Sequence, residues 1–298
     1  MEETNVNPLE QPLRQLLRHL NVVYGILLHL EYQLECYADA MRDKFGGRTA
    51  TATDVALYTQ LIVDDLTHPS GLFRYSSGGF ATEGEEYLEM SKRLISRNAA
   101  WAVVQGWERF DSFLLDTAAT CLLLHPEKIE RAVQEKFLKN NSASEFNTFD
   151  DLRFFVKQMY RGEKLLSYLR RLAPFISSGE EDNYRKLDLA CWYKTVAGVR
   201  HAVTHSNEVI SLKTYEEVTS SGSEMLMRYF PGTLESIGYR LALPKSAAQR
   251  VLETFASYGF LVFKALSMTY DYEWDILKGD FAKEEARRTR EAPPNSVG

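Results

Sequence analysis

Residues 99–124, AAWAVVQGWERFDSFLLDTAATCLLL, carry a regular apolar pattern. The large apolar residues recur at spacings of three, four and seven, which is the period of one face of an α-helix. These residues are Val103, Trp107, Phe110, Leu114, Cys121 and Leu124. The pattern predicts a helix over residues 85–124 that ends at His125-Pro126, because the residue before a proline disfavours helical geometry.

The same period predicts helices on both sides of this stretch. Residues 9–43 form one long amphipathic pattern, and Gly46-Gly47 ends it. Further helices are expected over 55–66 after an Asp54 cap, from Thr148 or Asp150 onward, over 161–172, from Tyr184 to 205, and from 246 to about 270. Residues 68–84 and 177–183 are expected to be loops, because they are rich in Gly, Ser and polar residues. The alternating segments 208–218 and 236–244 predict a small β-ribbon.

Composition and charge narrow the class of protein. The 298 residues are 45% hydrophobic and 26% charged, which is typical of globular domains. The net charge of −6 argues against wholesale attraction to nucleic acid, so any RNA contact must come from a local basic segment such as residues 161–171. We expect a cytoplasmic protein without a membrane segment, because the N-terminal residues are polar and the longest apolar run is too short to span a bilayer.

The helical pattern suggests a division into three parts. Residues 1–84 would form an N-terminal helical extension and loop, and residues 85–275 the main helical bundle with the β-ribbon inserted. Residues 276–298 are rich in charge and end in Pro, Asn and Gly, so we expect a disordered tail.

The three cysteines, Cys36, Cys121 and Cys191, lie singly in helical patterns. An odd number without CxxC spacing argues against a disulfide framework or a structural zinc site. Buried free thiols are the simplest interpretation.

The segment VRHAVTH, residues 199–205, concentrates two of the six histidines and an arginine. Three interpretations are open. The residues could form a solvated helix end, where His and Arg interact well with the helix dipole. His201 and His205 could share a metal ion, although no HExxH motif and no further His or Cys cluster is present. They could also perform acid–base chemistry beside a cation that stabilises a charged transition state.

A helical wheel separates two faces of residues 184–205. Leu189, Trp192, Val196, Val199 and Val203 form a narrow apolar stripe, which is the predicted core face. His201 and His205 are four residues apart and lie nearly opposite that stripe, with Arg200 on the flank. The small residues Ala190, Ala197 and Gly198 accompany the histidines. This composition suggests a second contact face that a partner surface can approach closely.

The arrangement of Arg200, the polar His201, three further residues and His205 resembles the signature of the HEPN family. The helix around Glu108 is similar to the HEPN helix that carries an acidic residue inside the bundle. The resemblance covers residues 85–270 and leaves residues 1–66 outside. His201 stands where Asn is commoner.

The resemblance implies an up-and-down helical bundle that dimerises through the motif helices. Many HEPN proteins are metal-independent endoribonucleases of toxin–antitoxin, abortive-infection and CRISPR-associated systems. The resemblance therefore implies three partners: RNA, a second copy of the chain, and an antitoxin or defence protein. It implies no cofactor. His205 would move the proton, Arg200 would neutralise the scissile phosphate, His201 would support either, and Glu108 would orient Arg200. The alternative is a catalytically silent HEPN-like module that binds a partner or a nucleotide.

Overall fold

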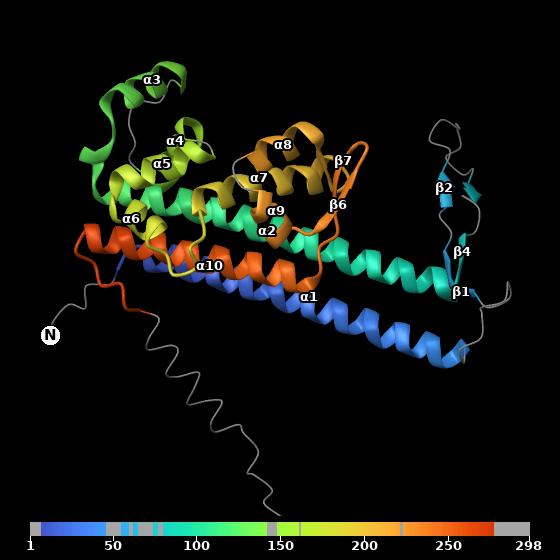
Figure 1. The fold of residues 1–298 in the computed structure, drawn as a ribbon. Coiled ribbons are helices and arrows are strands. Elements are labelled where there is room, and N and C mark those ends of the chain that lie inside the picture. Colours follow the sequence, from blue (N-terminus) through green and yellow to red (C-terminus); the bar gives the residue numbers. More distant parts are fainter. Residues whose placement is uncertain are drawn as a thin grey trace, which may run out of the picture. The chain divides into compact units, whose positions relative to one another are not determined.

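The computed structural model describes residues 7–45, 55–59, 62–64, 74–76, 80–141, 148–160, 162–220 and 223–276. Most of these residues are helical, and short antiparallel strands make up the rest of the regular structure (Figure 1). The helices are α1 Glu10–Phe45, α2 Gly84–Leu124, α3 Arg131–Asn141, α4 Phe149–Met159, α5 Glu163–Leu172, α6 Phe175–Glu181, α7 Leu189–His205, α8 Leu212–Ser220, α9 Ser223–Tyr229 and α10 Lys245–Thr269, with a 3₁₀ turn at Pro126–Lys128. The strands are β1 Val55–Thr59, β2 Ile62–Asp64, β3 Arg74–Ser76, β4 Phe80–Glu83, β5 Val209–Ser211, β6 Gly232–Glu235 and β7 Gly238–Leu241.

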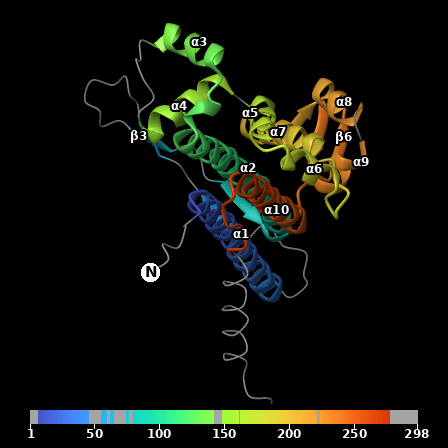
Figure 2. The same cartoon turned by 90° about the vertical axis from the view of Figure 1, so that its left-hand side faces the viewer.

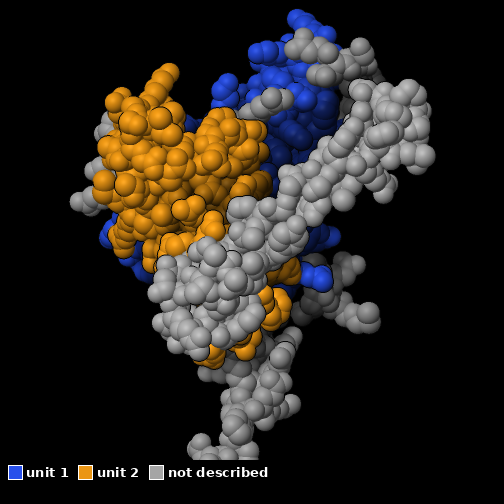
Figure 3. Space-filling view, turned by 90° about the vertical axis from the view of Figure 1, so that its right-hand side faces the viewer, with its two compact units in different colours: residues 1–21, 105–198, 252–298 blue, residues 22–104, 199–251 orange. Residues whose placement is uncertain are grey.

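The chain divides into two compact units that interleave along the sequence (Figure 3). Unit 1 contains residues 1–21, 105–198 and 252–298, and unit 2 contains residues 22–104 and 199–251. The division at residues 84 and 275 that the sequence suggested remains a prediction. The predicted disordered tail is residues 276–298, and all of it from residue 277 onward lies outside the described residues.

The long helices predicted from apolar spacing are confirmed. Helices α1, α2 and α10 match the patterns over 9–43, 85–124 and 246–270 within a few residues. The apolar stripe of α2 is buried, except that Leu124 at the end of the helix is exposed. Thr148 caps α4 as predicted: its hydroxyl accepts from the Asp151 amide, and the Asp151 carboxylate accepts from the Thr148 amide.

Aromatic side chains fill the core of unit 1. The rings of Trp107 on α2 and Tyr193 on α7 have centroids 4.5 Å apart. Phe255 on α10 lies 5.2 Å from Phe110 and 4.9 Å from Trp192. The buried faces of α2, α7 and α10 therefore meet in one cluster, and tilted aromatic pairs add to the stability that burial provides.

Glycine sets the spacing between the helices that run beside α10 in unit 1 (Figures 1 and 2). A Cβ atom on Gly106 of α2 would lie 2.6 Å from Leu252 of α10. A Cβ atom on Gly259 of α10 would lie 2.5 Å from Leu16 of α1. These approaches are closer than real Cβ contacts, so an alanine at either position would force the facing leucine side chain to shift.

A three-stranded antiparallel sheet with the order β5-β7-β6 lies in unit 2. The predicted β-ribbon is therefore present, but residues 212–218 of the predicted alternating segment belong to helix α8 instead. The Tyr239 ring stacks on Tyr215 with centroids 5.3 Å apart, and the Tyr239 hydroxyl donates to the carbonyl of Phe230 at 3.1 Å. These contacts fasten α8 and the end of α9 to the sheet.

For the residues that the structure describes, the predicted helix over 55–66 and the predicted loop over 68–84 are wrong: 55–59, 62–64, 74–76 and 80–83 are strands. Strand β1 pairs with β4 and β2 pairs with β3, both antiparallel. The two N-terminal strands are rich in β-branched and aromatic residues, which fit a pleated strand better than a helix. Their partners β3 and β4 begin only at Arg74 and Phe80, further along the chain than the spacing of one helical pattern reaches.

The connection before α7 also differs from the prediction. Helix α6 extends to Glu181 inside the predicted loop, and α7 begins at Leu189 instead of Tyr184. The Asn183 side chain donates to the Leu187 carbonyl and accepts from the Leu187 amide, so it closes a turn there. Lys186 has φ 49°, which interrupts a helix. Asp188 then accepts from the Cys191 amide at 2.9 Å, as an N-cap residue does.

All three cysteines are free, but only Cys121 is buried. Cys191 is half-buried, and the expectation of a buried thiol is wrong for Cys36. Cys36 lies four residues after the exposed Tyr32 on α1, on the face of the helix that turns away from the buried leucines.

Helix α10 is long and apolar enough to cross a membrane, with a mean hydropathy of 1.2 in its most apolar window. Of that window, 61% is buried inside the protein. A core helix passes the same test of length and composition, and the aromatic contacts of Phe255 fit that interpretation.

Candidate functional site

The burial of one face of α7 determines where the motif residues point. The predicted stripe of Leu189, Trp192, Val196, Val199 and Val203 is buried throughout. Because His201 and His205 lie on the other side of the helix, both are exposed, and their ring centroids lie 5.0 Å apart. Arg200, on the flank, is half-buried. The structure therefore brings these three residues together on the last turns of α7.

The end of α7 is fixed to the sheet of unit 2. Asn207 and Glu208 have φ of 48° and 66°, which reverses the chain immediately after the helix. The Glu208 amide donates to the Ala202 carbonyl at 3.1 Å, and the Glu208 carbonyl accepts from Leu241 of β7 at 2.9 Å. Asn adopts this left-handed conformation readily, whereas it is unfavourable for Glu. The two backbone hydrogen bonds of Glu208 therefore hold it in this conformation.

Charged side chains of unit 2 lie near Glu208, which follows the end of α7. Arg97 of α2 lies 3.9 Å from the Glu208 carboxylate. Arg240 of β7 donates to Glu235 at 2.7 Å, and this hydrogen bond raises the pKa of Arg240. In this group two acids balance two cations, so it does not form a broad basic surface.

Trp101 is an exposed aromatic residue that the sequence analysis did not select. It lies one turn after Arg97 on α2, so the two side chains share a face of the helix in unit 2. The spacing of four residues from Arg97 to Trp101 is the signal in the sequence that could have indicated this pair. An aromatic face beside a cation is an arrangement that can stack on a nucleobase.

The remaining predicted site residues are Glu108 on α2 and the small residues of α7. Glu108 is exposed on α2, but it belongs to unit 1 while Arg200, His201 and His205 belong to unit 2. Its pairing with Arg200 therefore remains a prediction. Ala190 is exposed, and Ala197 and Gly198 are half-buried. The dimer through this face also remains a prediction.

A metal site at His201 and His205 would need further ligands beside the two histidines. Among the described residues, no group of three or more His, Cys, Asp and Glu side chains is arranged to hold a metal ion. His201 and His205 would thus supply two ligands, whereas a protein site for Zn²⁺ uses three or four.

The basic segment at α5 is largely neutralised by acids. Arg170 pairs with Glu180, and Arg171 lies 2.8 Å from Glu130. Lys164 is exposed, and Arg161 lies outside the described residues. Of the described cations of this segment, Arg170 is therefore held in a shielded ion pair and Arg171 in an exposed one, which weakens the expectation that this segment contacts RNA.

A charged network in unit 1 was not visible in the sequence. The Arg170 guanidinium donates to both oxygens of Glu180, at 2.8 and 3.0 Å, and the Tyr258 hydroxyl donates to the same carboxylate. Burial, and next the negative charge of Glu180, raise the pKa of Tyr258, so its hydroxyl stays protonated. The three residues come from α5, α6 and α10, and no local spacing links them.

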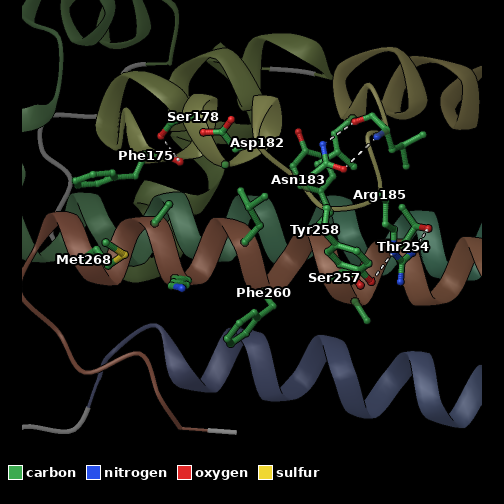
Figure 4. A pocket seen from close by; sticks show the side chains of 18 of the residues that line it. Phe175, Ser178, Asp182, Asn183, Arg185, Thr254, Ser257, Tyr258, Phe260 and Met268 are labelled. Atoms are coloured by element: carbon green, nitrogen blue, oxygen red, sulfur yellow. Dashed lines mark hydrogen bonds between the residues drawn. The ribbon is translucent and has the colours of Figure 1, made fainter.

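A groove of about 740 Å³ lies in unit 1 beside this network (Figure 4). One wall is α10, and the other is α6 with the connection 182–189. Its surface is mainly apolar, and Arg185, Lys264 and Asp182 are the charged side chains that line it.

The fold and the two sites define a mostly helical protein with an exposed pair of histidines and a separate apolar groove. No protein-family model, curated protein or solved structure matches the chain.

Proposed function

We propose that the protein is an endoribonuclease that cleaves RNA without a metal ion, using Arg200, His201 and His205. The observation that carries the proposal is the exposure of two histidine rings with centroids 5.0 Å apart beside a half-buried arginine. A solvated helix end alone does not require this combination. The resemblance of these residues to the HEPN signature supports the same chemistry.

The chemistry needs only groups that these residues supply. One histidine removes the proton from the ribose 2′-hydroxyl, and the resulting oxygen attacks the adjacent phosphorus. The bond from phosphorus to the 5′-oxygen breaks, and a protonated histidine donates its proton to that oxygen. The products are a 2′,3′-cyclic phosphate and a 5′-hydroxyl. Arg200 stabilises the negative charge that builds up on the phosphoryl oxygens.

His205 is the first candidate for the proton transfer, and His201 either supports it or acts as the second acid–base group. Exposed, adjacent rings leave both groups accessible to a phosphodiester. Trp101 and Arg97 add a stacking surface and a cation in the same unit.

A second copy of the chain would complete the site. Small residues on the histidine face, Ala190, Ala197 and Gly198, allow close approach of a symmetry-related helix, and a two-fold contact buries such a patch most simply. Glu108 would orient Arg200 in the assembled protein. The role that fits this activity is that of a toxin or an anti-phage defence protein, controlled by a partner protein.

The test is an RNA cleavage assay on the purified full chain, with and without EDTA. We expect cleavage that survives EDTA and leaves 2′,3′-cyclic phosphate ends. The variant His205→Ala should lose a factor of about 10²–10⁴ in rate. The matched control is His29→Ala, which removes an exposed histidine of α1 in the same unit.

Other outcomes would replace the proposal. Loss of activity in EDTA with recovery by zinc or manganese would favour the metal interpretation. Cleavage by His205→Ala at the wild-type rate would exclude this residue from catalysis. No cleavage of any RNA tested, together with a stable dimer, would favour the catalytically silent interaction module.

A further inference from the structure

The groove in unit 1 is built to hold an elongated apolar molecule. Leu261 and Phe260 of α10 line it, and Phe175 and Met268 remain 51% and 42% exposed at one end. Four large apolar side chains thus border a volume of about 740 Å³, which is within the range of small-molecule sites in proteins. Burying these side chains under a ligand would remove apolar surface from water.

The opposite end of the groove carries an arginine held by hydroxyl groups. Arg185 is half-buried; its Nε donates to the Tyr184 hydroxyl at 2.9 Å and its Nη1 to Thr254 at 3.2 Å. Among the residues that the structure describes, no carboxylate forms an ion pair with Arg185. Because a guanidinium has five N–H donors, further donors remain for an acceptor in the groove.

The two ends differ in chemistry along α10. Figure 4 shows Phe175 and Met268 at one end and Arg185 with Thr254 at the other. Between them, the Lys264 ammonium lies 3.9 Å from the centroid of the Trp274 ring. With Asp182 as the acid of the lining, the cations outnumber the acids, so the groove favours a negatively charged ligand.

We propose that this groove binds a small amphipathic carboxylate, with its chain against Phe175, Leu261 and Met268 and its carboxylate on Arg185. One guanidinium with donors to spare matches one carboxylate in geometry and charge. Thr254 on α10 contacts the guanidinium before the ligand arrives, which lowers the cost of ordering the arginine; Tyr184, which accepts from its Nε, is itself 83% exposed. The site is independent of the histidine surface and of the proposed RNA cleavage.

Isothermal titration of the full chain with decanoate, below its micelle concentration, tests the proposal. We expect saturable binding of one decanoate per chain, and weaker binding of both decanol, which lacks the charge, and acetate, which lacks the chain. Arg185→Gln should weaken decanoate binding roughly tenfold or more while leaving decanol binding unchanged.

Two further variants keep the experiment decisive. Met268→Glu places a negative charge at the apolar end, and because Met268 is partly exposed the fold should tolerate it; binding of both decanoate and decanol should be lost. Arg131→Gln, a change of a largely exposed arginine on α3 outside the groove, should bind like the wild type. Absence of saturable decanoate binding, or wild-type affinity in both Arg185→Gln and Met268→Glu, would overturn the proposal.

Discussion

The carboxylate of Glu180 offers a sharp test of how unit 1 is held together. Glu180 is 12% exposed and its partner Arg170 is 25% exposed, so the pair is largely shielded from water. The change Glu180→Gln keeps the size of the side chain and an acceptor for the Tyr258 hydroxyl but removes the charge. Arg170 would then remain mostly buried without its counter-charge.

The expected cost follows from this burial. Removing one partner of a fully buried ion pair costs about 3–5 kcal/mol. Because a quarter of the Arg170 side chain still reaches water, we expect Glu180→Gln to lower the free energy of unfolding by about 2–3 kcal/mol. Urea denaturation followed by far-ultraviolet circular dichroism measures this difference.

A matched control and a double variant complete the experiment. Arg171 and Glu130 form an ion pair at a similar distance but are largely exposed, so Arg171→Gln should cost less than about 1 kcal/mol. Adding Arg170→Met to Glu180→Gln removes the isolated cation and should recover part of the lost stability. Equal costs for Glu180→Gln and Arg171→Gln, or strict additivity of the double variant, would refute the reasoning.

Three further predictions follow from burial. His205→Ala should change the unfolding free energy by less than about 1 kcal/mol because the residue is exposed, whereas Val199→Ala should lower it by about 2 kcal/mol because it removes buried methyl groups; urea melts of both variants compare the two. Burial, and next the charge of Arg109, lower the pKa of His19, so the unfolded state binds more protons at this residue than the folded state does. Stability should therefore fall as the pH drops below about 6.5, and His19→Gln should reduce the loss of melting temperature between pH 7 and pH 5. A thiol reagent at pH 8 should label the exposed Cys36 fast and spare Cys121, since burial raises the pKa of Cys121 to about 12; a fast phase that persists in Cys36→Ser would contradict this.

Helical spacing predicted the parts of the fold whose information is local. The stripes of α2 and α7 and a helix start at Thr148 or Asp150 each depend on residues within a few turns; the stripes are buried apart from Leu124, and Thr148 is the cap. The strands β1 to β4 were missed because a strand is stabilised by a partner elsewhere in the chain. The start of α7 was placed too early because the Asn183 turn is formed by side-chain hydrogen bonds that composition does not reveal.

The same distinction explains the candidate sites. Arg200, His201 and His205 lie within six residues, so their shared region of α7 was predictable from sequence, and the exposure of the two histidines agrees with their place opposite the core stripe. The Glu180 network joins residues of α5, α6 and α10 that are up to 88 positions apart, from Arg170 to Tyr258, and the groove joins residues still further apart. Only the packing of unit 1 brings them together, and no motif indicates it.

The distribution of tryptophans gives the folded protein a built-in optical signal. Trp107 and Trp192 are buried in the aromatic core of unit 1, and Trp101 of unit 2 is exposed. Emission from the buried pair should be blue-shifted and protected from iodide, while Trp101 should be quenched readily. Trp274, also of unit 1, is half-buried. The blue-shifted, iodide-protected part of the emission therefore comes from Trp107 and Trp192, and it can report the melting of unit 1 without a label.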